Sequence, residues 1–200
     1  MTTNNKIELM APAGNFESLQ AALDNGCDSV YFGVEQLNMR ARASVNFTMD
    51  DLAEIAKRCE AKNVRSYLTL NTIIYDHDLS VVKTLINKAK EANITAVIAS
   101  DQAVIAMARS VGMEVHISTQ LNVTNIETIK FYSLFADTMV LSRELSLRQV
   151  KKITEQIEKE QIKGPNGNLV VIEIFGHGAL CMAVSGKCYL RMHTHNSSAK

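Results

Sequence analysis

The chain alternates short apolar runs with amphipathic stretches along almost its whole length, and this alternation limits the possible folds more than any other feature. The runs start about 20 to 36 residues apart, which is the length of one strand–helix unit. Such alternation favours a parallel sheet covered by helices. The expected strands are Ile7–Met10, Ser29–Gly33, Arg65–Asn71, Ala96–Ala99, Glu114–Ile117, Thr138–Leu141 and Leu169–Ile174.

The stretches between the runs have the apolar periodicity of helices that rest on a sheet. Leu52, Ile55, Ala56 and Cys59 follow the i, i+3, i+4, i+7 spacing, which places them on one helical face. Similar stripes recur after the fourth run and before the seventh. Cys59 is therefore predicted to be a small core residue.

Two folds fit this pattern: a closed (β/α) barrel and an open, doubly wound α/β sheet. The first run is followed by Ala11–Asn15, which lacks the G-x-G-x-x-G fingerprint of dinucleotide-binding sheets, so the barrel is favoured. A TIM barrel has eight strands, and seven runs are present here. The prediction is a single TIM-like barrel domain over residues 1–200 that lacks its last strand–helix unit and is truncated at its C-terminus.

The amino-acid composition limits the compartment in which this domain can work and the partners that it can bind. Hydrophobic residues make up 46% of the chain, which is enough for a core, and 21 basic residues balance 21 acidic ones. Bulk charge therefore gives no argument for nucleic acid or an anionic membrane, although a local basic patch is compatible with it. No apolar run resembles a secretory signal or a membrane span. We expect a cytoplasmic protein, in which four cysteines indicate thiols or metal ligands more than disulfides.

Polar residues follow most of the later runs. In a barrel the active site forms from the loops after the strands, so we expect these residues to converge on one rim. Asp101 can instead cap a helix, Gln120 can bond loop backbone, and Arg143 with Glu144 can form a surface pair. An arginine directly after a buried run can also clamp a carboxylate or phosphate. The residues are Asn71, Asp101, Ser118, Gln120, Arg143, Glu144 and His177.

Cys181 and Cys188 differ from the other cysteines, because they follow the last run in a segment that contains glycine and serine. Two thiolates at this spacing can share a metal if the loop turns back, but zinc and iron–sulfur sites usually need four ligands. His177 lies four residues before Cys181, so a histidine-activated thiolate is an alternative. The residues alone leave both interpretations open.

The segment from Glu173 to Cys188 reads E-x-F-x-H-G-A-L-C-x-x-x-S-G-x-C and resembles the signature of peptidase family U32, the collagenase-like proteases. The similarity extends over nearly the whole chain. Further blocks that resemble the family are Glu8–Asn15, Ser29–Gly33, Arg40 with the residues up to Phe47, Thr69–Asn71, Ser118–Asn125 and Leu141–Leu145.

The resemblance implies a barrel-like domain and a metal site. It implies that Cys181 and Cys188 are the first two of four cysteine ligands of an iron–sulfur cluster, the other two lying beyond Lys200. On these grounds we take Arg143, Glu144, His177 and Glu173 as candidate catalytic residues. The candidate substrate-binding residues are Asn71, Asp101, Ser118, Gln120 and Arg40.

Several proteins of this family hydroxylate tRNA, ribosomal RNA or a ubiquinone precursor, and some depend on prephenate. The leading hypothesis is therefore an RNA hydroxylation enzyme, or a subunit of one, with an iron–sulfur cluster and prephenate as a candidate co-substrate. RNA is the expected substrate. The protein is also expected to bind a protein partner or a second copy of itself. Two alternatives remain open: a peptidase, as the family name indicates, and a non-catalytic accessory subunit that carries the cluster.

Overall fold

The computed structural model of the protein describes residues 7–34, 37, 47–178 and 183–185. Within them, seven parallel strands pair in the order in which they occur in the chain, which confirms the expected α/β fold. The strands are β1 (Met10–Pro12), β2 (Ser29–Phe32), β3 (Arg65–Leu70), β4 (Ala96–Ala99), β5 (Glu114–Ile117), β6 (Thr138–Val140) and β7 (Val171–Glu173).

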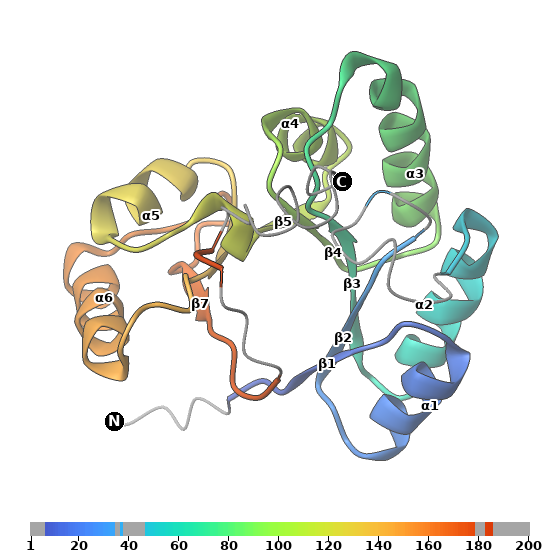
Figure 1. Ribbon diagram of the computed structural model, residues 1–200, viewed down its shortest axis with the longest axis horizontal. Coiled ribbons are helices and arrows are strands. Elements are labelled where there is room, and N and C mark those ends of the chain that lie inside the picture. The colour runs from blue at the N-terminus through green and yellow to red at the C-terminus, as the bar shows by residue number, and fades with distance from the viewer. Residues whose placement is uncertain (1–6, 35–36, 38–46, 179–182, 186–200) are drawn as a thin grey trace.

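The helices lie in an arc around the outside of the curved sheet (Figure 1). They are α1 (Phe16–Asp24), α2 (Leu52–Glu60), α3 (Leu79–Glu91), α4 (Gln102–Ser110), α5 (Ile126–Tyr132) and α6 (Leu147–Glu160), with short 3₁₀ helices at Met49–Asp51, Asp76–Asp78 and Thr119–Leu121. The arrangement is that of a curled half-barrel, in which β1 and β7 form the two ends of the sheet. In the part of the chain that is described, no helix is long and apolar enough to cross a membrane.

The first strand begins later than the sequence indicates. The apolar run starts at Ile7, but pairing with β2 begins at Met10, opposite Ser29. The side chains of Ile7 and Leu9 are 89% and 61% exposed. An apolar run does not by itself specify where a partner strand starts, so the boundary depends on the register with β2.

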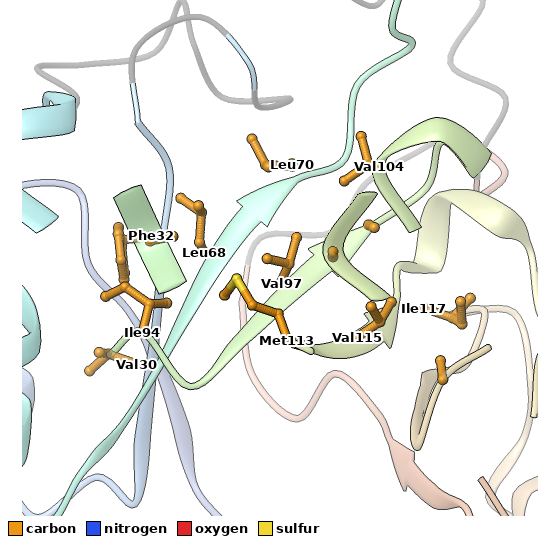
Figure 2. Close-up of a cluster of buried hydrophobic side chains, with 14 of the residues drawn as sticks. Val30, Phe32, Leu68, Leu70, Ile94, Val97, Val104, Met113, Val115 and Ile117 are labelled. Atoms are coloured by element: carbon orange, nitrogen blue, oxygen red, sulfur yellow. The ribbon is translucent and has the colours of Figure 1, made fainter. Parts of the chain in front are cut away.

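The strands from β2 to β6 bury most side chains of both faces, and the two faces differ in chemistry. Successive side chains of a strand point to opposite sides, so one set faces the helices and the other faces the concave interior. Figure 2 shows the helix-facing set as a continuous apolar cluster, to which Phe32, Leu68, Val97 and Ile117 belong. The interior set includes Tyr67 and His116, which are 1% and 3% exposed. Tyr67 and His116 thus place polar groups on the inner face of the sheet.

Side-chain caps fix the starts of several helices and, through them, the loops at the carboxyl ends of the strands. Asn15 Oδ1 accepts a hydrogen bond from the backbone N–H of Ser18 at 2.8 Å, in a capping box that opens α1. Asp101 caps α4 directly after β4, and Asn125 caps α5. The caps hold the loops that surround the interior.

Candidate functional site

A cavity of about 220 Å³ lies inside the curved sheet, at the carboxyl ends of the strands. This is the position at which (β/α) barrels place their active sites. The wall combines inner-face side chains with the loops after β1, β2, β3, β5 and β7. Its residues are Met10, Pro12, Ala13, Gly14, Tyr31, Phe32, Gly33, Thr69, Asn71, Ile98, Ser118, Thr119, Gln120, Val140, Glu173 and Phe175.

Three of the expected substrate-binding residues meet on this wall. The side-chain amide of Asn71, after β3, donates to the hydroxyl of Ser118, after β5, at 3.4 Å. That hydroxyl also accepts from the backbone N–H of Gln120 at 3.3 Å and thereby caps the 3₁₀ helix Thr119–Leu121. The cap fixes the loop on which Gln120 lies, so the amides of Asn71 and Gln120 belong to one wall.

The remaining wall supplies aromatic surface and an unused hydroxyl. Tyr31 of β2 and Phe175 after β7 both line the cavity, and Phe175 is 52% exposed at its edge. Thr69 of β3 also lines it, and its buried Oγ1 has no hydrogen-bond partner among the described residues. A buried hydroxyl without a partner carries a free-energy cost that a bound polar group would remove.

Glu173, a candidate catalytic residue, lines the cavity from the inner face of β7, beside a buried histidine of β5. Its Oε2 lies 3.9 Å from Nδ1 of His116, and Nε2 of the same ring lies 3.2 Å from Oε1 of Glu114. The ring of Tyr67 packs against the imidazole with 4.5 Å between ring centroids. Two carboxylates and an aromatic ring therefore enclose one imidazole.

The pKa values of the two carboxyl groups beside His116 are shifted in opposite directions. Burial raises the pKa of Glu173, and the neighbouring imidazole of His116 opposes this rise. The hydrogen bond with His116 lowers the pKa of Glu114 despite its partial burial. Burial also raises the pKa of Tyr67 to about 12, so that its hydroxyl stays protonated, and it donates to Oε1 of Glu8 at 2.8 Å.

His116, Tyr31 and Thr69 were not among the residues predicted from the sequence, because they lie on the inner face of the strands and not in the loops after them. Strand periodicity contains the missing signal. Counting back by two from Ser118 gives His116, and counting back by two from Asn71 gives Thr69. The same rule applied to Gly33 gives Tyr31.

Arg143 and Glu144, expected at the same rim, do not line the cavity. The guanidinium of Arg143 donates to the carbonyl of Ala183 at 3.3 Å and to the hydroxyl of Ser185 at 3.5 Å. Oε1 of Glu144 accepts from the backbone N–H of Ser185 at 2.7 Å. Val140 is the inner-face residue of β6 that lines the cavity. By residue 143 the chain has left the strand, and the side chains of Arg143 and Glu144 instead hold the segment 183–185.

Asp101 and His177 also lie outside the cavity wall. Both carboxylate oxygens of Asp101 bond backbone N–H groups, that of Ala103 at 2.8 Å and that of Ile74 at 3.2 Å. Asp101 is thus a helix cap that also holds the loop after β3. His177 is exposed, since the chain leaves the inner face after Phe175. The expectation that Asn71, Gln120, Arg143 and His177 line one cavity holds for the two amides and is corrected for the other two.

Arg40, Cys181 and Cys188 lie outside the described residues. The expectation that Cys27 and Cys59 pack in the core is confirmed, because they are 7% and 1% exposed. Burial raises the pKa of both thiols, that of Cys59 to about 11, and this disfavours the thiolate form that binds metals. In the described part of the chain no group of three or more His, Cys, Asp or Glu side chains fits a metal ion. The described residues therefore supply no ligand set for an iron–sulfur cluster.

The chain is similar to several known proteins. The family model for peptidase family U32 matches residues 14–200. A collagenase of Porphyromonas gingivalis is 57% identical over 98% of the chain and 47% of its own length. The tRNA hydroxylation protein P1 of Bacillus subtilis is 32% identical over 94% of the chain and 42% of its own length. The chain thus spans less than half the length of these relatives.

The fold agrees with the sequence match. A solved structure described as a U32 peptidase superposes with a TM-score of 0.62, at 14% identity, over 78% of this chain and 67% of that one. At this level of identity the likeness concerns the fold alone. The family model, in contrast, covers nearly the whole chain. The chain therefore belongs to peptidase family U32.

Proposed function

We propose that the protein takes part in hydroxylating a pyrimidine base of tRNA or ribosomal RNA, as the enzyme or as a subunit of it. The observation that carries the proposal is the size and chemistry of the cavity. Its volume of about 220 Å³ is below the roughly 300 Å³ at which pockets for drug-sized ligands begin. A single ring fits such a space better than a stretch of peptide.

The wall also has the groups that a base-modifying pocket needs. Enzymes that react on a base take it out of its stack, hold it by stacking, and bond the polar edge of its ring. Tyr31 and Phe175 offer aromatic surface for the ring. The amides of Asn71 and Gln120 and the hydroxyl of Thr69 offer donors and acceptors for its edge. Relatives named as tRNA hydroxylation proteins support the same reaction class.

The proposal includes an iron–sulfur cluster held by Cys181, Cys188 and further residues beyond Lys200. A cluster would supply the redox chemistry that hydroxylation requires. The segment 183–185, between the two cysteines in sequence, contacts a residue of the cavity wall, because the Ser185 hydroxyl is 3.5 Å from that of the lining residue Thr119. Prephenate as a co-substrate, and a protein partner or second copy, belong to the same proposal.

The test is mass spectrometry of nucleosides from tRNA and ribosomal RNA of cells with and without the gene. We expect a hydroxylated pyrimidine nucleoside to disappear on deletion and to return with the wild-type gene. Gln120→Leu should not restore it, since the variant removes an amide from the cavity wall. Gln156→Leu should restore it, because Gln156 lies on α6 and bonds only Glu160 in the described structure, at 2.7 Å. Unchanged nucleosides in the deletion strain would overturn the proposal.

A peptidase is the second candidate, and the 57% identity to a protein named collagenase favours it. The described histidines give it little geometric support. His116 pairs with Glu114 and Glu173, and His77 pairs with Asp78 at 3.5 Å, so neither is oriented on a hydroxyl or thiol. His177, the third described histidine, is exposed, and Cys181, the thiol expected beside it, lies outside the described residues. Cleavage of gelatin by the purified full-length protein, abolished by Cys181→Ala but kept after anaerobic metal removal, would support this candidate and not the first.

A further inference from the structure

We propose that Glu173 and His116 form a proton-exchanging pair at the inner wall of the cavity, with Glu114 orienting the imidazole. In this pair Glu173 is the group that touches the bound ring, and His116 is a positioning residue. The assignment of the ring as the ligand rests on the proposed function, whereas the pair itself rests on the geometry of β5 and β7.

The geometry starts with the imidazole, which the sheet holds in place. His116 is 3% exposed and lies on the inner face of β5, packed against the ring of Tyr67. Glu114, two residues earlier on the same face, bonds its Nε2 at 3.2 Å. This leaves Nδ1 directed to the other side, where Oε2 of Glu173 lies at 3.9 Å. A histidine that one carboxylate orients toward another group is a recurring acid–base arrangement.

The hydrogen-bonding capacity of the ring then fixes how many protons the pair shares. Glu114 is the ionised partner, so Nε2 carries the proton that it accepts. In a neutral ring Nδ1 is then an acceptor, and only a protonated Glu173 can bond it. In a charged ring Nδ1 is a donor, and Glu173 is a carboxylate. In either bonded state, one proton lies between Nδ1 and Oε2, so the pair can exchange it once the two atoms come within hydrogen-bond distance.

The present separation leaves this bond unmade. Nδ1 of His116 is buried and has no hydrogen-bond partner among the described residues. At 3.9 Å the two atoms are beyond hydrogen-bond distance, but such contacts are often long before a ligand binds and shorten in the complex. A ligand that presses Glu173 inward would complete the bond and relieve the unsatisfied nitrogen.

The other groups around His116 do not compete for this proton. From β3, Tyr67 keeps its own proton and bonds Glu8, which in turn pairs with Arg65. From β4, the inner-face residues Ala96 and Ile98 carry no charge. Glu173 is therefore the group through which a proton on this imidazole can reach the cavity wall.

The step that we assign is a proton transfer alone. One bond from hydrogen to nitrogen, oxygen or carbon in the bound ring breaks as one O–H bond forms on the Glu173 carboxylate, and the reverse transfer returns the proton. His116 accepts or supplies the same proton through Nδ1, so Glu173 can be reset without water entering the cavity. General acid–base groups of this kind contribute about 10²- to 10⁴-fold to rate.

The direct test is NMR of the full-length protein with labelled histidine nitrogens and labelled glutamate carboxyl carbons. In the wild type we expect a neutral His116 to keep its proton on Nε2. His116→Gln should raise the pKa of Glu173 further, because the imidazole opposes the rise that burial causes. His77→Gln is the control and should leave the Glu173 titration unchanged. A Glu173 titration that is the same in His116→Gln and in the wild type would refute the pair.

The activity arm separates this inference from the proposed function. Glu173→Gln should lower kcat for RNA hydroxylation by about 100-fold or more, and His116→Gln should shift the pH profile of kcat with a smaller loss. His77→Gln should leave both unchanged. If His116 and Glu173 are coupled by NMR but no RNA is hydroxylated, the pair stands and the proposed function fails. If RNA is hydroxylated and both variants behave as wild type, the proposed function stands and the pair fails.

Discussion

At the scale of single residues, the inner face of the sheet places two glutamates beside one imidazole and gives them opposite properties. Glu114 is bonded by His116, which favours its ionised form and lowers its pKa. Glu173 is more deeply buried and has no such bond, so burial raises its pKa. Two identical side chains on opposite sides of one imidazole can therefore act as a fixed charge and as a proton carrier.

Glu173→Gln should change stability in a pH-dependent way. Its pKa is raised above the unfolded value of about 4.3, so the folded state binds the proton more tightly. The contribution of Glu173 to stability is then complete below the unfolded pKa and is lost as the pH rises through the folded pKa. The uncharged variant should raise Tm at pH 8 and have little effect at pH 4, as measured by thermal unfolding.

Glu114→Gln is the matched comparison, and its effect on Tm should have the opposite sign. The pKa of Glu114 is lowered, so its contribution is present above the unfolded pKa and is lost as the pH falls through the folded pKa. The variant should lower Tm at pH 8 and lower it less in acid. Equal Tm changes at both pH values for the two variants would contradict these assignments of burial and hydrogen bonding.

At the scale of elements, the turn between α6 and β7 shows how a loop is fixed onto the sheet. Oδ1 of Asp137, just before β6, accepts from the backbone N–H of Asn166 at 2.9 Å. Gly164 lies so close that an added Cβ would be 2.4 Å from that oxygen and 2.8 Å from Cα of Asp137. The backbone N–H of Gly164 also donates to the carbonyl of Asn168 at 2.9 Å. The absence of a side chain lets the turn approach the start of β6.

Gly164→Ala should therefore destabilise the protein. Backbone atoms cannot move aside as a flexible side chain can, and overpacking of this kind costs about 1–3 kcal/mol. Gly176→Ala is the control, because nothing lies within 4 Å of its added Cβ, and surface changes of this kind usually stay within about 0.5 kcal/mol. Denaturant unfolding measures both. Equal free energies of unfolding for the two variants would show that the turn does not pack as described.

At the scale of the whole molecule, the seven strands curl without closing. β1 and β7 are the ends of the sheet, and their outer edges have no strand partner within the described residues. Apolar side chains lie beside these edges, with Leu9 61% and Val171 57% exposed. Open edges with apolar side chains favour pairing with another chain or segment. We therefore expect the two open edges to be where this chain pairs with another.

Leu9→Lys should weaken self-association of the 200-residue chain. Leu9 directly precedes the edge strand β1, and a lysine there disfavours edge-to-edge pairing, because the charge would lose water in the pair. Leu147→Lys makes the same chemical change at a site that is 75% exposed and lies in the first turn of the helix α6. Sedimentation over a range of concentrations should show a lower mean mass for Leu9→Lys only. A chain that stays monomeric at every concentration would contradict the prediction.

Much of the architecture could be predicted from the sequence, because it follows from periodicity. Runs such as Ala96–Ala99 and stripes such as that ending at Cys59 specify strands and helices without reference to distant residues. The convergence of Asn71, Ser118 and Gln120 followed from the rule that parallel strands end on one rim. The start of β1 and the positions of Arg143 and His177 were not predictable, since register and loop direction depend on partners far away in the chain.

The sequence by itself determined the alternation of strands and helices, the buried state of Cys27 and Cys59, and the family. The tertiary structure alone decided which polar residues share a site. It turned His116 and Glu173 toward each other from strands more than fifty residues apart, and it directed Arg143 to Ser185 and Asp101 to the cap of α4. The physical reason is that propensity and periodicity are local, whereas hydrogen bonds and desolvation depend on which surfaces the folded chain brings into contact.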